Sequence, residues 1–370
     1  MRPSLRSHSG ALQIRGCPAA LPRPHFLPRH ARPRGFNDAG RTPIKTLLLA
    51  LAGAITLGLA SATAQTPSAP QPAWPQRQVT VIVPFTAGGT TDLFARIFTQ
   101  AMQQKYGTAF VVENRAGAGG TVGAGAAARA PKDGYTLFVG TASTHAIAPY
   151  VYKQLAYDSD RDFQPISLFA TLPNMLVVSN SIPARTFSEF VAYAKANPGK
   201  LNYGSSGIGA SNHIPAEIIS NLIGAPMTHI PFRSSNEIMN ALVGGHIHLA
   251  FDNITFAWPQ AQGGTVRAIA VTSKERSPTA PDVPAIAETF PDFDIGTWHG
   301  LFAPAGVPRA IVDQIAADVK EIYSRPDVVA KLKEIGAVAA PNTPDVFTAF
   351  ARSERERYQR IVREARIEPQ

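Results

Sequence analysis

Two glycine-rich turns hold the residues of this sequence that are best placed to bind a charged group. The first turn, at residues 84–92, follows an apolar strand pattern at residues 79–83 and leads into a helical pattern. The second, at residues 116–121, has the same arrangement. A strand, a glycine turn and a helix N-terminus expose several backbone N–H groups at one point, and such groups bind anions. Neither turn has a Lys or Cys placed for phosphate or covalent chemistry, so the pattern favours capture of a carboxylate over catalysis.

A third glycine turn, at residues 203–213, could hold a second anionic group from the opposite side of a cleft. Its hydroxyls and exposed amides belong to Ser205, Ser206 and the residues around Gly207. An ordinary turn with a serine cap would explain the same residues. The hydrolase motif G-x-S-x-G is not matched, because Ile208 stands at its last glycine position. His213 either contacts the ligand or has a capping or core role.

Polar residues also follow three other predicted strands. Thr141 and Ser143 follow the strand at residues 136–140, Arg233 lies in a strand-to-helix turn, and Asp252 ends the strand at residues 248–252. Arg233 could bind a carboxylate through two hydrogen bonds or form a surface ion pair. Asp252 could accept a hydrogen bond from a ligand ammonium or hydroxyl, or cap the next turn. Ligands of α/β proteins bind beyond the carboxyl ends of the strands, so these residues predict one shared site.

The elements that position these residues alternate between strands and helices. Strands are expected at residues 79–83, 109–113, 136–140, 166–170, 175–179, 201–204, 228–230, 248–252 and 267–272. Helices are expected at residues 91–105, 121–129, 144–149, 187–196, 211–222, 235–244, 308–324, 326–335 and 344–365. This alternation predicts an α/β protein with largely parallel strands and flanking helices. Because a strand, a glycine turn and a helix occur in both halves, we expect two lobes around a shared cleft.

The sequence before residue 77 predicts export. Residues 41–64 combine basic residues, a short apolar run and Ala62-Thr63-Ala64, which is the pattern of a cleaved signal peptide. We expect residues 1–40 to be a disordered or misannotated leader and residues 65–76 to be a flexible tether. The formal charge is +9, of which residues 1–45 contribute +8 (nine Arg and Lys, one Asp), leaving +1 for the rest. The basic character therefore belongs to the leader and does not indicate nucleic-acid binding.

No cofactor or metal is expected. The only cysteine, Cys17, lies in the leader, and the histidines lack the spacing of a metal site. The stretch at residues 123–128 matches a dinucleotide-binding pattern formally, but it lies inside a helix and no acidic residue follows at the required distance. We interpret it as a closely packed helix face.

Five motifs together resemble the solute receptors of tripartite tricarboxylate transporters, of the Bordetella-uptake-gene type. They are Pro84-Phe85-Thr86-Ala87-Gly88-Gly89-Thr90-Thr91-Asp92, Glu113-Asn114-Arg115-Ala116-Gly117-Ala118-Gly119-Gly120, Tyr203-Gly204-Ser205-Ser206-Gly207, Ile230-Pro231-Phe232-Arg233 and Gly300-Leu301-Phe302-Ala303-Pro304-Ala305-Gly306. The resemblance covers residues 77–370. Thr86, Thr90 and the Arg233-Ser234-Ser235 stretch depart from the residues common in the family, so the identity of the carboxylate is not carried over.

The resemblance implies a two-lobed periplasmic binding fold of type II with a ligand cleft between the lobes. Lobe 1 would comprise residues 77–172 and 303–370, lobe 2 residues 173–302, and the chain would cross between them near residues 169–175 and 298–303. It implies that a small carboxylate contacts the following residues: Phe85, Thr86, Gly89, Thr90 and Asp92 from one lobe and Ser205, Ser206, Gly207 and Ser211 from the other.

The expected function is that of a periplasmic, monomeric, non-enzymatic receptor that passes a small carboxylate or amino acid to membrane permease subunits. Two alternatives stay open. An enzyme acting on carboxylates could use His213 or Asp252 as a base, although no nucleophile–base pair is evident. A binding module of the same fold could also serve a sensor kinase instead of a permease.

Overall fold

The computed structural model describes residues 74–370. The expected leader and signal peptide, and all of the expected tether except Trp74, Pro75 and Gln76, lie outside the described residues.

The strands are β1 (Val79–Val83), β2 (Phe110–Asn114), β3 (Thr136–Thr141), β4 (Phe163–Val178), β5 (Asn202–Ser205), β6 (Thr228–Pro231), β7 (Leu249–Asn253), β8 (Arg267–Val271), β9 (Gly296–Pro304) and β10 (Val338–Ala339). The α-helices are α1 (Thr90–Tyr106), α2 (Thr121–Ala128), α3 (Ala148–Val151), α4 (Phe187–Ala196), α5 (Ile214–Ile223), α6 (Ser235–Val243), α7 (Ile254–Gln262), α8 (Arg309–Tyr323), α9 (Pro326–Glu334) and α10 (Pro344–Glu364).

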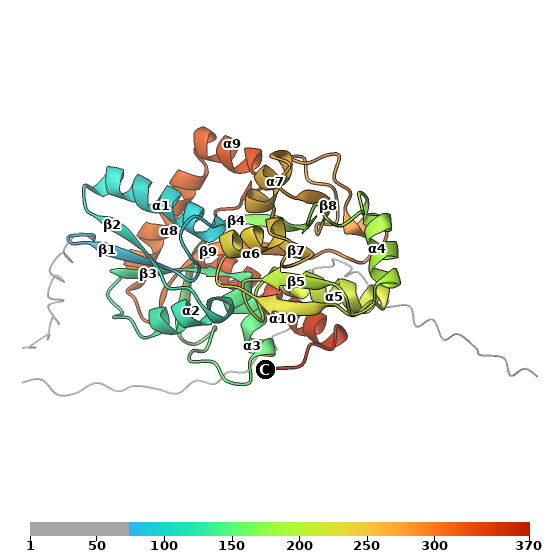
Figure 1. The fold of residues 1–370 in the computed structure, drawn as a ribbon. Coiled ribbons are helices and arrows are strands. Elements are labelled where there is room, and N and C mark those ends of the chain that lie inside the picture. The colour runs from blue at the N-terminus through green and yellow to red at the C-terminus, as the bar shows by residue number, and fades with distance from the viewer. Residues whose placement is uncertain (1–73) are drawn as a thin grey trace, which may run out of the picture. The chain divides into compact units, whose positions relative to one another are not determined.

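The strands form one mixed sheet in the order β2-β1-β3-β9-β4-β7-β5-β6, with β8 and β10 also paired to β4 (Figure 1). The pairs β1–β2, β1–β3, β5–β6 and β5–β7 are parallel, as the α/β alternation predicts. The central pairs are antiparallel, because β9 and β4 run against their neighbours. The α/β fold class is therefore confirmed, with antiparallel pairing at the centre of the sheet.

Strand β4 belongs to both halves of this sheet. Its first part, from Phe163 to Pro173, pairs with β9, and its second part, from Asn174 to Val178, pairs with β7. The sequence predicts two strands here because Pro173 and Asn174 interrupt the apolar pattern. The break does not occur, since an antiparallel partner, Gly296, faces Pro173 and the strand continues through it.

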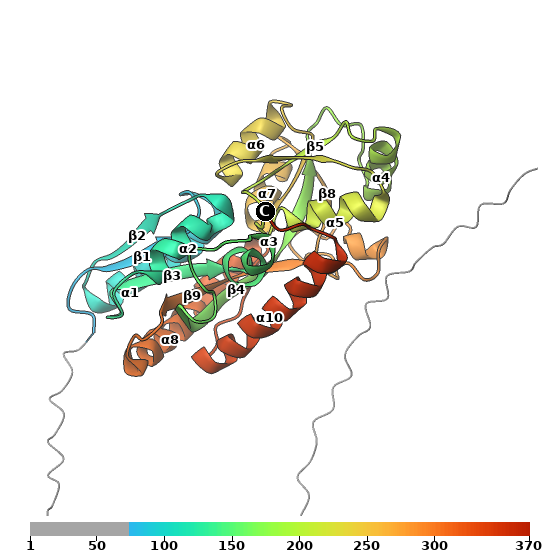
Figure 2. The same ribbon diagram turned by 90° about the horizontal axis from the view of Figure 1, so that it is seen from below.

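Strand β9 is absent from the expected strands. Its sequence includes Gly296, His299 and Gly300, which weaken a strand pattern. In the structure the side chain of Phe347 from α10 packs over Gly300 and occupies the place of its missing Cβ. Figure 2 shows α10 running alongside the sheet. The strand is thus stabilised by a helix that follows far later in the chain.

Side-chain caps fix the start of some of the helices. Thr186 accepts a hydrogen bond from the Glu189 N–H at the start of α4, and Ser234 accepts one from the Glu237 N–H at the start of α6. The expected helix at residues 144–149 differs, since it begins with a π-helical turn, Ser143–Ile147, before α3. This turn follows β3 directly and places Ser143 at the end of that strand.

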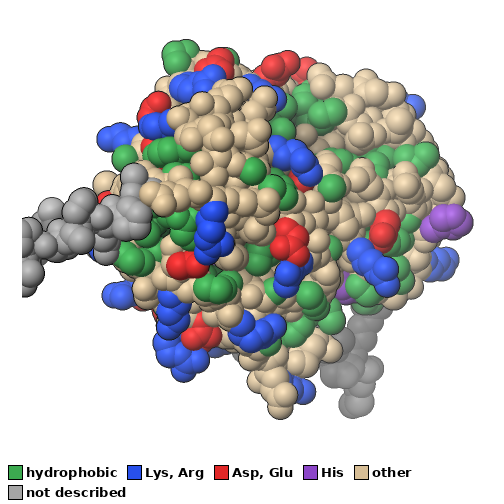
Figure 3. Space-filling model, turned by 90° about the vertical axis from the view of Figure 1, so that its left-hand side faces the viewer, with side chains coloured by type: hydrophobic (Ala, Val, Ile, Leu, Met, Phe, Trp, Pro, Cys, Tyr) green, Lys and Arg blue, Asp and Glu red, His purple; other side chains and the backbone are tan. Residues whose placement is uncertain are grey.

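The surface of the described part carries mixed charge. On the face shown in Figure 3, basic and acidic side chains lie interspersed, and hydrophobic side chains occur in small groups. Two exposed apolar residues, Val111 and Val122, are isolated in sequence from one another. Among residues 74–370, no helix combines the length and the apolar character needed to cross a lipid bilayer.

Candidate functional site

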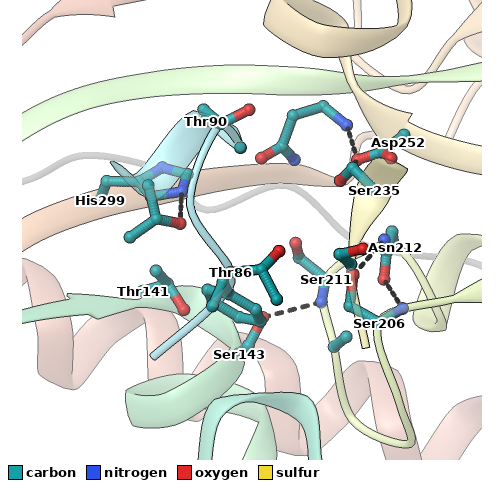
Figure 4. Close-up of a pocket in the computed structure, with 16 residues that line it drawn as sticks. Thr86, Thr90, Thr141, Ser143, Ser206, Ser211, Asn212, Ser235, Asp252 and His299 are labelled. Carbon is teal, nitrogen blue, oxygen red and sulfur yellow. Dashed lines mark hydrogen bonds between the residues drawn. The ribbon is translucent and has the colours of Figure 1, made fainter. Parts of the chain in front are cut away.

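A small polar cavity of about 40 Å³ lies where turns from both halves of the sheet meet (Figure 4). The β1–α1 turn, the end of β3 and strand β9 contribute from one half, and the loop after β5, the start of α6 and the end of β7 contribute from the other. The carboxyl ends of strands therefore converge on one point, where ligands of α/β proteins bind.

Nine of the fourteen predicted site residues line this cavity: Phe85, Thr86, Gly89, Thr90, Thr141, Ser143, Ser206, Ser211 and Asp252. Seven lining residues were not predicted: Thr91, Ala210, Asn212, Ser234, Ser235, Asn253 and His299. Most of these seven are neighbours of predicted residues in the same turns. His299 is the exception. Its signal in the sequence is a single histidine within the apolar run 298–303, and only the pairing of β9 with β3 brings it to the cavity.

Asp92, which was predicted to contact the ligand, does not line this cavity. Its carboxylate accepts hydrogen bonds from the Gly88 N–H (3.0 Å), the Asn114 amide (3.0 Å) and Arg96 Nε (2.7 Å). Burial alone would raise the pKa of Asp92, but these hydrogen bonds hold it below its usual value. Asp92 therefore organises the turn at residues 84–92, and it lines an adjoining hollow of about 370 Å³.

Ser205 and His213 lie behind the third glycine turn and not in the cavity. The Ser205 hydroxyl is 2.6 Å from Nε2 of His229 and accepts a hydrogen bond from the Gly207 N–H. The rings of His213 and His229 pack 4.4 Å apart. Burial lowers the pKa of His213 to about 3, with a further contribution from His229, so the imidazole ring is neutral at pH 7. His213 therefore has the core role considered from the sequence. Ser205 is fully buried and lies outside the cavity lining.

Gly89 and Gly207, from the first and third glycine turns, differ in their backbone environment. Gly89 has φ −86°, an ordinary value, and a Cβ there would meet only the Thr86 carbonyl oxygen, at 3.8 Å. Gly207 has φ +114°, and a Cβ there would lie 2.7 Å from the Gly119 nitrogen. Gly207 therefore allows two backbone segments to approach each other and does not line the cavity.

Arg233 also lies outside the cavity lining. Its backbone N–H donates to the Glu237 carboxylate at the start of α6, and the residue is exposed. The two serines that follow it, Ser234 and Ser235, line the cavity instead. Of the two roles considered for Arg233, its exposed position fits a surface residue better than a clamp on a ligand in this cavity.

Hydrogen bonds connect the loop after β5 to the other half of the sheet. The Ser211 N–H donates to the Ser143 hydroxyl (2.9 Å), and the Tyr152 hydroxyl donates to the Ile208 carbonyl (2.7 Å). On the opposite side of the cavity, the hydroxyls of Thr90 and Thr255 lie 2.6 Å apart. These contacts enclose the cavity from both sides.

Three buried polar atoms of the cavity lining have no hydrogen-bond partner within the described part of the chain: Thr141 Oγ1, Asp252 Oδ2 and His299 Nδ1. Burial lowers the pKa of His299 to about 3, so its ring is neutral at pH 7. Burial raises the pKa of Asp252 to about 6, against hydrogen bonds from Ser235 and the Asn253 N–H. Unpartnered buried polar groups are costly, so a ligand group that hydrogen-bonded to these atoms would be stabilised.

The cavity lining contains no Lys or Arg among its sixteen residues, all of which the structure describes. An anion would therefore be bound by hydroxyls, amides and backbone N–H groups. The first turn of α1, at Thr90 and Thr91, adds free N–H groups and the positive end of a 17-residue helix. A polar cavity enclosed by turns from two halves of a mixed α/β sheet is the arrangement of a solute-binding protein.

Comparison with known proteins agrees with this class. The sequence model of the tripartite tricarboxylate transporter family receptor matches residues 94–367. The chain belongs to this receptor family, which confirms the resemblance inferred from its motifs. The family is one of transporter receptors.

Individual relatives are similar over most of their length. A UPF0065 protein in the tcbD-tcbE intergenic region of Pseudomonas sp. strain P51 is 37% identical over 313 residues, which cover 84% of this chain and 93% of the relative. The structure of R. palustris Rpa4515 with adipate has a TM-score of 0.79 and 34% identity, covering 80% of this chain and 100% of that one. The structure of MatC (Rpa3494) from Rhodopseudomonas palustris with bound malate has a TM-score of 0.74 and 35% identity, and the match covers 78% of this chain and 99% of that one.

Proposed function

We propose that this chain is a periplasmic receptor that binds a small organic carboxylate in the cavity described above and delivers it to the permease of a tripartite transporter. The observation that carries the proposal is the convergence of neutral donors from both halves of the sheet on one polar cavity. Membership of the receptor family supports the transport role, and the adipate and malate of two similar structures support the ligand class.

The ligand is bound between two lobes in this proposal. Lobe 1 comprises residues 77–172 and 303–370, and lobe 2 comprises residues 173–302. The division of β4 between two sets of partners, near Pro173, supports the first boundary. The contacts of Ser211 with Ser143 and of Thr90 with Thr255 would then join the lobes around the ligand.

We propose that the protein binds and releases the ligand without changing it chemically. Of the two bases considered from the sequence, His213 does not line the cavity, and Asp252 lines it without a nucleophile hydrogen-bonded to its free oxygen. Delivery to a permease is favoured over delivery to a sensor kinase because the matching family is one of transporter receptors.

A ligand screen tests the proposal directly. We expect at least one small carboxylate to raise the thermal stability of the protein, because a ligand that binds only the native state stabilises it by about 2.7 kcal/mol at a hundredfold excess over Kd. Melting temperatures would be measured with millimolar adipate, L-malate, succinate, glutarate, L-aspartate and L-glutamate. Mass spectrometry of the recovered ligand should show no change. The absence of a melting shift throughout this panel would contradict the proposal.

The predicted export of the protein is the second part of the proposal that can be tested. We expect the mature protein to begin at Gln65, because Ala62-Thr63-Ala64 has the small residues that signal peptidase recognises. Intact-mass measurement of protein from the periplasmic fraction checks this. A matched control is the variant Ala64→Leu, which should retain the preceding segment. A wild-type product that still contains residues 41–64 would show that the signal peptide is wrongly placed.

A further inference from the structure

Asp252 is the one acidic side chain in the cavity lining, and half of its carboxylate is unused. It ends strand β7 and is 2% exposed. Its Oδ1 accepts hydrogen bonds from the Ser235 hydroxyl (3.0 Å) and the Asn253 N–H (2.8 Å). Its Oδ2 has no donor among the described residues. Figure 4 shows Asp252 beside Ser235 at the edge of the cavity.

The charge of Asp252 conflicts with the binding of a plain carboxylate. Its pKa of about 6 leaves it mainly ionised at pH 7.5. The cavity lining has no Lys or Arg, and His299 is neutral. Because Asp252 lines the cavity, a carboxylate bound there would lie close to it, and the two negative charges would repel each other in a buried site. A ligand group that donates a hydrogen bond to Asp252 would relieve this repulsion.

We infer that Asp252 determines specificity by accepting a hydrogen bond at Oδ2 from a hydroxyl or ammonium group that the ligand carries in addition to its carboxylate. The inference rests on the proposed function and narrows its ligand class to hydroxy acids and amino acids. Both groups satisfy the unpartnered oxygen. An ammonium also supplies the missing positive charge, so the charge balance of the cavity favours an amino acid over a hydroxy acid.

Matched ligands separate the contribution of the donor from that of the carboxylates. The first set is succinate, L-malate and L-aspartate, and the second is glutarate, L-2-hydroxyglutarate and L-glutamate. Within each set the carbon chain is constant and only the donor changes. Calorimetric titration of the full mature chain at pH 7.5 should show that, in at least one set, a donor-bearing acid binds at least tenfold more tightly than the plain diacid.

The variant Asp252→Asn should reverse this preference. Ser235 and the Asn253 N–H both donate to one oxygen, so the amide oxygen of the substituted side chain would take that place and its NH2 would point where Oδ2 was. That NH2 donates, so it would favour the plain diacid and oppose an ammonium. We expect succinate or glutarate to bind more tightly to the variant than to the wild type, and the amino acids to bind at least tenfold more weakly.

Asp318→Asn is the matched control. Asp318 is also buried, but it lies on α8 and is bound to Lys105 and Tyr106, away from the cavity. This variant should change stability without changing the order of ligand affinities. Equal binding of all members of a set by the wild type, or an unchanged order in Asp252→Asn, would overturn the inference while leaving carboxylate binding intact. If no acid in either set binds and adipate does not bind, the proposed function fails as well.

Discussion

Gly119→Ala is expected to weaken ligand binding about tenfold to hundredfold while leaving the protein folded. Gly119 lies in the short helical turn Ala118–Gly120, and a Cβ there would lie 2.5 Å from the carbonyl oxygen of Ile208. Ile208 belongs to the loop that places Ser206 and Ser211 in the cavity. Overpacking of this kind costs about 1–3 kcal/mol, and in a receptor that encloses its ligand the cost falls on the enclosed state.

Gly107→Ala provides the control for this prediction. Gly107 has φ +67°, close to the +63° of Gly119, but a Cβ at Gly107 would meet nothing within 4 Å. Both variants therefore carry the same backbone strain, and only Gly119→Ala carries the clash. Titration with the best carboxylate of the screen, together with melting temperatures, separates the two effects. If both variants bind with wild-type affinity, the close approach at Gly119 has no part in binding.

Asp92→Ala is expected to lower the free energy of unfolding by about 2–4 kcal/mol. Removing one partner of a buried hydrogen-bonded ion pair leaves the remaining donors unsatisfied. Here the donors are the Gly88 N–H, the Asn114 amide and the guanidinium of Arg96. Because Arg96 is half exposed, the loss should be smaller than for a fully buried pair. Urea unfolding at pH 7 gives the measurement.

The pH dependence of this loss has a definite sign. The folded-state pKa of Asp92 is lowered, so its stabilisation is present above its unfolded pKa, near 3.8, and is lost as the pH falls below that value. The difference between wild type and Asp92→Ala should therefore shrink between pH 5 and about pH 3. Asp133→Ala is the control, because the pair of Asp133 with Arg77 is exposed and should contribute under about 1 kcal/mol. A stable Asp92→Ala protein that has lost ligand binding would instead indicate direct contact with the ligand.

The sequence was sufficient to predict the α/β class and the turns that meet at the site. Strand patterns followed by glycine and hydroxyl residues are local signals, and the turns at residues 84–92 and 203–213 do reach one cavity, whereas no residue of the glycine turn at residues 116–121 lines it. The family followed from the combination of motifs and is confirmed. Local signals could not reveal the continuity of β4 through Pro173, because that depends on its partner Gly296, more than a hundred residues later.

Within a turn, the sequence could not distinguish residues that line the cavity from residues that support them. Ser205 and Ser206 are adjacent and chemically alike, but Ser206 lines the cavity and Ser205 bonds to His229 behind it. The alternation of side chains along a strand end decides this, and its phase is set by the pairing of β5 with β6 and β7. His299 was missed for a related reason, since only the antiparallel pairing with β3 brings it next to Thr91.

The place of β9 in the sheet has a consequence for the order in which the chain can fold. Strand β9, at residues 296–304, lies between β3 and β4, so the strands of the first half cannot form their complete sheet until nearly the whole polypeptide is available. Pairings between segments so distant along the chain form slowly, because the intervening loop must be closed first. The N-terminal segments of a growing chain would thus remain without their central partner. Because the sheet is completed late, the chain would stay unfolded for longer. An unfolded chain can pass through a membrane channel, which fits the export proposed above.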